Sequence, residues 1–196
     1  MIIYLHGFRS SPQSYKARSL KQHMESLGLG SLFWCEALPY SPLDAIALIE
    51  TQIAASSTPV TLVGSSLGGY YATYLAEKHS IKAALINPAV VAHLSLADYV
   101  GPQTNLYTNE VFDFSEAHID ALRTMEVTTL STPQHFLLLV ETGDEVLDYR
   151  QAVEKYKGCE QVVLEGGDHS FTQFDAYRDQ IIAFAETGPI HLPTTG

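Results

Sequence analysis

The sequence is poor in positive charge. Lys and Arg number 11 against 22 Asp and Glu, which gives a formal net charge of −11 over 196 residues. A surface that binds nucleic acid or an anionic membrane needs a cluster of basic side chains to neutralise the phosphates. The acidic balance therefore argues against nucleic acid and against a membrane as the main partner, and it leaves the actual partner open.

Cysteine is also scarce, and long apolar runs are missing. The two cysteines, Cys35 and Cys159, cannot build a disulfide framework, and we expect both to be buried, reduced thiols. No CxxC pair and no Cys/His cluster occurs, so we expect neither a metal nor a cofactor. No apolar run approaches the roughly 18 residues of a membrane span, and the N-terminus lacks the pattern of a secretory signal. We expect a cytoplasmic protein.

The length and the hydrophobic content of the chain suit one globular domain. Its hydrophobic fraction of 46% is ordinary, and its length allows a sizeable core. We expect a single domain over residues 1–188. Residues 189–196 are expected to form a loose tail, because prolines and threonines there bury little surface.

Short apolar strands alternate with helices along most of the chain. The expected strands are 1–5, 31–35, 60–63, 81–86, 134–141 and 161–164. The expected helices are 14–27, 41–55, 67–79 (LGGYYATYLAEKH), 115–125, 147–157 and 171–186. This α/β alternation predicts a mostly parallel sheet with helices on both faces. Ligands of such sheets bind at the loops that follow the strands.

Residues 89–133 interrupt this alternation. We expect a small cap or insertion there, with room for a pair of helices, and we hypothesise that it forms a lid. Its aromatic side chains are Tyr99, Tyr107, Phe112 and Phe114. Plain packing of each aromatic inside the domain is an equally open interpretation.

The pattern G-x-S-x-G occurs at residues 64–68, between the apolar stretch VTLV and a helical stretch. This strand–turn–helix context is typical of a nucleophile elbow, in which the central serine is exposed at the sheet edge. Ser66 is therefore the expected nucleophile, and Gly64 and Gly68 allow strand and helix to approach each other. Ser65 is the alternative hydroxyl, but the glycines centre on Ser66, so we expect Ser65 to shape the site.

An acyl-transfer serine needs a base and an acid that orients the base. His169 lies in the loop after the last strand, and Asp144 directly follows the strand before it. Both agree with the chain order Ser…Asp/Glu…His. Alternatives for the acid are Glu141, Glu145, Asp148 and Asp168. Glu141 is expected within the strand, and Asp168 adjoins the base, so its side chain should point elsewhere.

Two backbone donors are needed for the developing oxyanion. The N–H of Leu67 follows the nucleophile, and the N–H of Phe8 lies in the HGF loop after the first strand. Gly7 permits a close backbone approach, and we expect His6 to brace the loop by hydrogen bonding. Arg9 comes next and is a candidate contact for an anionic part of a substrate. A solvated or salt-bridged arginine is the favoured alternative.

Five segments of the chain carry a family resemblance, namely HGFRSSP, VGSSLGGYYATYLAEK, NPAV, TGDEVLDYRQAV and GGDHSF. In this order they resemble the α/β-hydrolase superfamily, and more closely the small YqiA-like esterases. The resemblance extends from residue 1 to about residue 185. It implies a minimal α/β-hydrolase fold and esterase activity on short acyl esters. Carried over by position, it implies a triad of Ser66, Asp144 and His169.

The sequence thus predicts a serine carboxylic-ester hydrolase that acts on a small-molecule acyl ester or thioester through an acyl-enzyme. An acyl-CoA thioesterase or acyltransferase with the same triad is the alternative. A non-catalytic ligand-binding homologue is a less favoured one. A triad does not set the bond that is cleaved. The natural substrate, the preferred chain length and the oligomeric state stay open.

Overall fold

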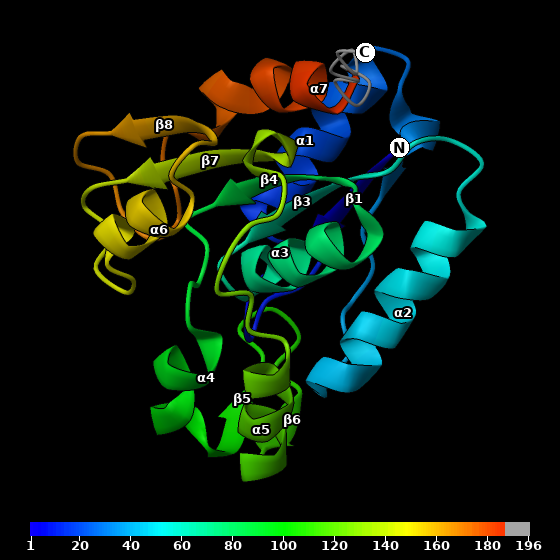
Figure 1. The fold of residues 1–196 in the computed structure, drawn as a ribbon. Helices are drawn as coiled ribbons and strands as arrows, with labels where there is room; N and C mark the ends of the chain where they lie inside the picture. The colour runs from blue at the N-terminus through cyan, green and yellow to red at the C-terminus, as the bar shows by residue number, and fades with distance from the viewer. Residues whose placement is uncertain (187–196) are drawn as a thin grey trace, which may run out of the picture.

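A computed structural model describes residues 1–186 of the chain. Six strands form one sheet in the order β2-β1-β3-β4-β7-β8, and every neighbouring pair is parallel. The strands are β1 (Ile2–Leu5), β2 (Phe33–Trp34), β3 (Thr61–Ser65), β4 (Lys82–Ile86), β7 (Phe136–Glu141) and β8 (Glu160–Leu164). This sheet confirms the expected α/β class (Figure 1).

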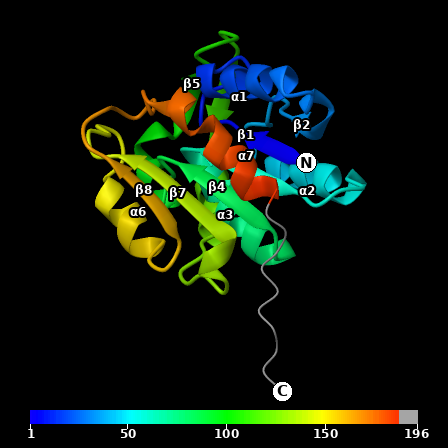
Figure 2. The ribbon, with the colours of Figure 1, turned by 90° about the horizontal axis from the view of Figure 1, so that it is seen from above.

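Helices cover both faces of the sheet. One face carries α1 (Tyr15–Ser26) and α7 (Arg178–Glu186), which lie in front of the strands in Figure 2. The other carries α2 (Pro42–Ala55), α3 (Leu67–His79) and α6 (Tyr149–Lys155). Each face has its own hydrophobic core, as expected for a parallel sheet enclosed by crossover helices.

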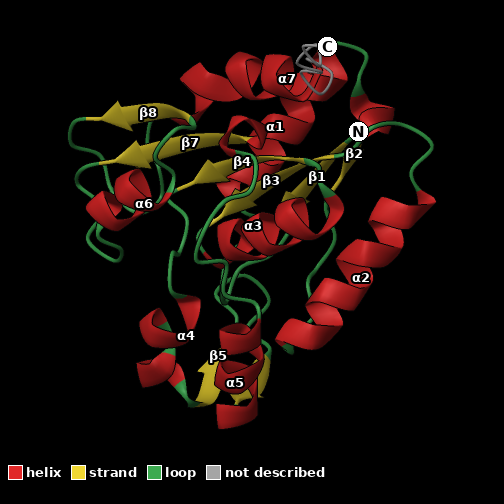
Figure 3. Cartoon of the chain, viewed as in Figure 1, coloured by secondary structure: helices red, strands yellow, loops and turns green. Residues whose placement is uncertain are grey.

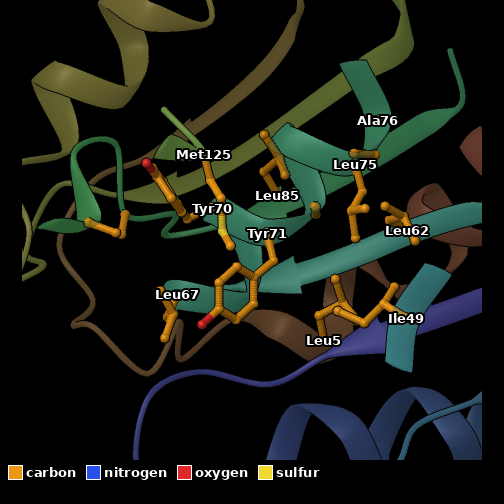
Figure 4. Close-up of a cluster of buried hydrophobic side chains, with 14 of the residues drawn as sticks. Leu5, Ile49, Leu62, Leu67, Tyr70, Tyr71, Leu75, Ala76, Leu85 and Met125 are labelled. Atoms are coloured by element: carbon orange, nitrogen blue, oxygen red, sulfur yellow. The ribbon is translucent and has the colours of Figure 1, made fainter. Parts of the chain in front are cut away.

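The central strands are buried on both sides. All six residues of β7 are buried, and successive side chains point to opposite faces. Leu138 and Val140 join the core beneath α3, whereas Leu137 and Leu139 join the core beneath α1 and α7. Figure 4 shows the α3 side, where aliphatic and aromatic side chains of helix and sheet interlock. Continuous apolar runs are what this two-sided burial requires.

The start of α2 follows from its first residues. The Ser41 hydroxyl accepts a hydrogen bond from the N–H of Asp44 at 3.4 Å, and Pro42 occupies the first helical position. Both features stabilise a helix N-terminus, where backbone N–H groups lack partners. The helix expected over residues 41–55 therefore begins with a side-chain cap at Ser41.

The cap region contains two helices, for which room was expected, and a hairpin, which was not predicted. It contains α4 (Ala92–Ser95), a 3₁₀ turn (Ala97–Tyr99), an antiparallel hairpin of β5 (Gly101–Thr104) and β6 (Val111–Phe114), and α5 (Glu116–Thr124). Figure 3 shows these elements set off from the sheet. The hairpin was not predicted because β5 contains glycine and proline and has no apolar alternation. Pro102 is tolerated because β5 pairs with β6 alone.

The last helix also begins later than expected, at Arg178 instead of residue 171. Phe171 has a φ of 59°, which interrupts any helix, and a 3₁₀ turn (Phe174–Tyr177) precedes α7. The other elements agree with the expected bounds to within two residues. The expected tail over residues 189–196, and the domain end at residue 188, lie outside the described residues.

Two remaining expectations concern the thiols and the membrane. Cys35 and Cys159 are free but only half-buried, not fully buried as expected. Burial still raises the pKa of each thiol to about 12. Within residues 1–186, no helix combines the length and the apolar character needed to cross a bilayer.

Candidate active site

Ser66 sits in a sharp turn between β3 and α3. Its φ of 55° and ψ of −120° are strained for a residue with a side chain. A Cβ at Gly64 would collide with the backbone of Gly68, and a Cβ at Gly68 would collide with the carbonyl of Leu5. Glycine is therefore required at both positions, which confirms that the two glycines let strand and helix approach.

Three predicted side chains meet at the carboxyl edge of the sheet. Nε2 of His169 lies 3.1 Å from Oγ of Ser66. Nδ1 of the same ring lies 2.8 Å and 3.0 Å from the two carboxylate oxygens of Asp144. These distances are within hydrogen-bond reach, which is the geometric requirement for a serine nucleophile with a base and an orienting acid.

The electrostatics of Asp144 favour an ionised carboxylate. Its side chain is 2% exposed, and burial alone would raise its pKa. Hydrogen bonds from His169 and from the N–H groups of Leu147 and Val146 outweigh burial, so the pKa of Asp144 is lowered. An ionised acceptor at Nδ1 keeps the proton there, and Nε2 is left to accept the Ser66 hydroxyl proton.

The alternative acids have other partners. Glu145 accepts the backbone N–H of His169 at 3.0 Å. Asp148 caps α6 and binds Arg150, and Asp168 accepts the N–H of Ser170. The alternative hydroxyl, Ser65, is buried.

Glu141 has a structural role that sequence reasoning missed. It is fully buried at the end of β7, and its carboxylate accepts the N–H groups of Asp168, Thr172 and Gln173 at 2.9–3.1 Å. The Thr172 hydroxyl adds a further bond at 3.0 Å. These donors all belong to the loop that carries His169. A carboxylate at the last position of an apolar strand was the available signal, because a buried charge needs partners.

Asn87 holds the same loop from the β4 side. Its amide nitrogen donates to the carbonyls of Asp168 and His169 at 3.0 and 3.2 Å, and its amide oxygen accepts the N–H of Glu141 at 3.0 Å. The Asn87 side chain is buried. Asn87 and Glu141 together form what we call the loop clamp, which fixes the backbone of the His169 loop.

The loop after β1 runs directly beside the nucleophile. A Cβ at Gly7 would lie 3.2 Å from Cβ of Ser66, so glycine allows this approach. The N–H groups of Phe8 and Leu67 make no backbone hydrogen bond within residues 1–186. Both N–H groups are therefore free to donate a hydrogen bond to a new acceptor.

His6 braces this loop as a neutral ring. Its Nε2 accepts the N–H of Leu38 at 3.0 Å, so Nδ1 carries the proton and donates to the carbonyl of Gly7 at 3.0 Å. Burial lowers the pKa of His6, and the Gly7 carbonyl opposes this only in part. The ring is thus a structural support and has no free nitrogen for acid–base chemistry.

Arg9 connects the loop to the cap. Its Nε donates to the carbonyl of Thr104 at 2.9 Å, and its own carbonyl accepts the N–H of Leu106 at 2.9 Å. The side chain is therefore engaged by the hairpin and forms no salt bridge within residues 1–186, and its contact with an anionic part of a substrate stays a prediction.

The cap aromatics mostly pack on Phe8. Its ring centre lies 4.9 Å from that of Phe114, 5.6 Å from Tyr99 and 5.9 Å from Phe112. Packing, the alternative interpretation, therefore describes these three residues. Tyr107 differs, because it lines the cavity beside Ser66.

That cavity has a volume of about 370 Å³ and includes Ser66 and His169 in its wall. Apolar side chains line part of it, namely Tyr4, Phe8, Leu106, Tyr107 and Phe171. Its size suits a small molecule. Across the part of the chain that the structure describes, no group of three or more His, Cys, Asp or Glu could hold a metal ion.

Several solved structures share this fold. Mouse alpha/beta hydrolase domain-containing protein 10 is 17% identical with a TM-score of 0.66, covering 93% of this chain and 89% of that chain. The esterase domain of a Rhodothermus marinus protein is 18% identical with a TM-score of 0.65 and coverages of 94% and 85%. The Paleococcus ferrophilus monoacylglycerol lipase is 17% identical with a TM-score of 0.66 and coverages of 93% and 94%.

These similarities establish the α/β-hydrolase fold. A family model matches residues 1–186, nearly the whole chain. The resemblance to YqiA-like proteins is thereby confirmed, and the chain belongs to the uncharacterised protein family UPF0227.

Proposed function

We propose that the protein is a serine hydrolase that cleaves short acyl esters. The observation that carries the proposal is the contact of His169 with both Ser66 Oγ and the Asp144 carboxylate. The strained backbone at Ser66 adds support, because such strain is typical of nucleophile elbows. The names of the structural relatives, which include an esterase domain and a monoacylglycerol lipase, agree with this class of reaction.

The reaction begins with proton transfer. Neutral His169 takes the hydroxyl proton of Ser66 at Nε2 while Oγ attacks the ester carbonyl carbon. Asp144 holds the ring in the correct tautomer and stabilises the imidazolium that forms. His169 then returns the proton to the departing alkoxide, and an acyl-enzyme on Ser66 remains.

Water completes the cycle. His169 removes a proton from a water molecule, whose oxygen attacks the acyl carbon. His169 then returns this proton to Oγ of Ser66 as the Ser66–acyl bond breaks and a carboxylic acid is released. In both tetrahedral intermediates, the N–H groups of Phe8 and Leu67 stabilise the negative oxygen. Leu67 opens α3, so the N-terminal end of the helix dipole favours the same charge.

Replacement of the nucleophile tests this proposal. Ser66→Ala should lower kcat for 4-nitrophenyl butyrate by roughly 10⁴-fold or more, because the covalent route is lost. The matched control is Ser57→Ala, an exposed serine in the turn before β3. A fluorophosphonate probe should label wild type and the control but not Ser66→Ala. Unchanged hydrolysis by Ser66→Ala would contradict the proposal.

The same assay should compare oxygen esters with CoA thioesters over several acyl lengths. A higher kcat/KM for the oxygen esters supports the esterase assignment. A higher value for CoA thioesters would keep the triad but change the proposed substrate to a thioester.

A further inference from the structure

The cavity beside Ser66 has a polar end that the proposed mechanism does not use. This end is formed where α1 begins, and it includes Lys16 and Ser14 together with Ser170. Nζ of Lys16 donates to the carbonyl of Ser170 at 2.7 Å. No carboxylate oxygen of residues 1–186 lies within 4.0 Å of this ammonium group. Lys16 is thus a half-buried cation without an ion-pair partner.

Protein groups use only part of the hydrogen-bonding capacity of the Lys16 ammonium. An ammonium has three donors, and one is used here. Charges removed from water are ordinarily paired, because their burial is unfavourable. Burial lowers the pKa of Lys16 to about 8, and the carboxylates of Asp168, Glu141 and Asp144 oppose this shift. The side chain is therefore mostly charged at neutral pH.

A neighbouring hydroxyl is also unpaired. Ser14 precedes α1 as its N-cap residue but makes no side-chain cap bond. Its Oγ is buried and has no hydrogen-bond partner among the described residues. The positive end of the α1 dipole lies at the same place, so three features at this end of the cavity favour negative charge.

We propose that this end of the cavity binds an anionic group of the substrate, with Lys16 as its ion-pair partner. This proposal rests on the proposed function. The substrate is then an ester that carries one carboxylate. The carboxylate and the scissile ester both fit within the cavity of about 370 Å³, so a short chain or one ring separates them.

The surrounding charges limit the substrate to a single anionic group. Lys16 is the one Lys or Arg in the described wall of the cavity, and Arg9 is engaged by Thr104. The carboxylates of Asp144, Asp168 and Glu141 are close enough to act on Lys16 and would repel further negative charge. A polyanion such as CoA matches this end of the cavity poorly.

Matched ester pairs test the proposal. One pair is 4-nitrophenyl hydrogen glutarate and 4-nitrophenyl butyrate, which differ by a carboxylate on the acyl side. The other pair is 4-acetoxybenzoate and phenyl acetate, which place the charge on the alcohol side. For at least one pair, wild type should prefer the charged ester, and Lys16→Gln should lose about 10- to 100-fold in kcat/KM for it, mainly through KM.

Controls separate recognition from structure. Lys16→Gln should keep the kcat/KM for the neutral ester within about threefold, and Lys16→Arg should retain most of the preference because it keeps the charge. Lys21→Gln, on the exposed face of α1, should change neither value. In wild type, butyrate should inhibit hydrolysis of the neutral ester more strongly than butyramide, a measurement that requires no variant.

Several outcomes would overturn the proposal. An equal loss on charged and neutral esters would mean that Lys16 only supports the Ser170 loop. Equal inhibition by butyrate and butyramide, or no preference in either pair, would mean that no anion site exists. Normal turnover of neutral esters in these cases would leave the proposed function intact, whereas absence of all turnover and of fluorophosphonate labelling would refute that function itself.

Discussion

At the scale of single residues, most groups at the site have one conformation because neighbours leave no other. Ser66 is held at positive φ by a turn whose glycines cannot be replaced without collision. Asp144 is held by the N–H groups of Val146 and Leu147, so its carboxylate faces His169 before any substrate binds. Such preorganisation lowers the cost of reaching the transition state.

His6 gives a prediction about pH at this scale. Its pKa is lowered in the folded protein, so below pH 6.5 the unfolded chain binds a proton that the folded chain does not. The free energy of unfolding should therefore fall as pH drops through this range, until the folded pKa is reached. His6→Gln cannot titrate and should show a smaller decrease of Tm between pH 7.5 and pH 5.5.

His135→Gln is the control for that measurement. His135 precedes β7 at the opposite edge of the parallel sheet from His6, which follows β1. This variant should keep the wild-type dependence of Tm on pH. If His6→Gln also kept it, the ring would not be the neutral brace described above.

At the scale of elements, three of the chain segments at the site are each held in place by separate contacts. The elbow is fixed by β3 and α3. The loop after β1 is tied to the cap, where Nε of Arg9 and the carbonyl of Ser10 bond to the hairpin. The His169 loop is fixed by the loop clamp of Asn87 and Glu141. The position of His169 therefore depends on residues that do not touch the reacting atoms.

Glu141→Gln tests the loop clamp. The amide can accept fewer of the loop's N–H bonds, and its own N–H₂ group would face the N–H groups of Asp168, Thr172 or Gln173. We expect kcat for 4-nitrophenyl butyrate to fall by about 10- to 100-fold with a smaller change in KM, because His169 is misplaced. The Tm should fall as well.

Two comparisons make this prediction specific to positioning. Glu141→Asp keeps the charge and should recover part of kcat, whereas Glu145→Gln should have a smaller effect because Glu145 accepts one loop N–H. Fluorophosphonate labelling of folded Glu141→Gln protein should be slow. Wild-type kcat with a lowered Tm would show that Glu141 contributes to stability only.

At the scale of the whole molecule, one sheet joins two cores into one cooperative unit. Strands buried on both faces leave no surface at which the two halves could separate. The acidic charge is a property of the whole surface, and it contrasts with the unpaired cation at Lys16 inside the cavity. A negative surface repels polyanions, while a single anion can still be bound by a local cation.

Neighbouring residues of β7 test this cooperativity. Leu137 and Leu138 are both fully buried but face different cores. Leu137→Ala and Leu138→Ala should each lower the free energy of unfolding by about 2–5 kcal/mol, since each leaves a cavity. Urea unfolding followed by circular dichroism and by fluorescence should give coincident single transitions. Separate transitions, or no effect of one variant, would contradict a single unit.

The sequence by itself determined the features that depend on local pattern. Apolar runs specified the strands, and the glycines around Ser66 specified the elbow, because each requires only neighbours along the chain. The proximity of Ser66, Asp144 and His169 could likewise be predicted, since the loops that follow parallel strands lie at one edge of the sheet. The bounds of most elements followed from the same local patterns.

Only the tertiary structure decided what depends on contacts between distant segments. The hairpin of the cap could not be predicted, because its stability comes from pairing and from packing on Phe8 instead of from its own apolar pattern. The loop clamp of Asn87 and Glu141 joins the ends of β4 and β7 to the His169 loop, whose Asp168 lies 27 residues after Glu141. The late start of α7 follows from the positive φ of Phe171 in the same loop. Nothing near Lys16 in the sequence indicates that it lines the cavity of Ser66; that follows from how α1 packs against the His169 loop.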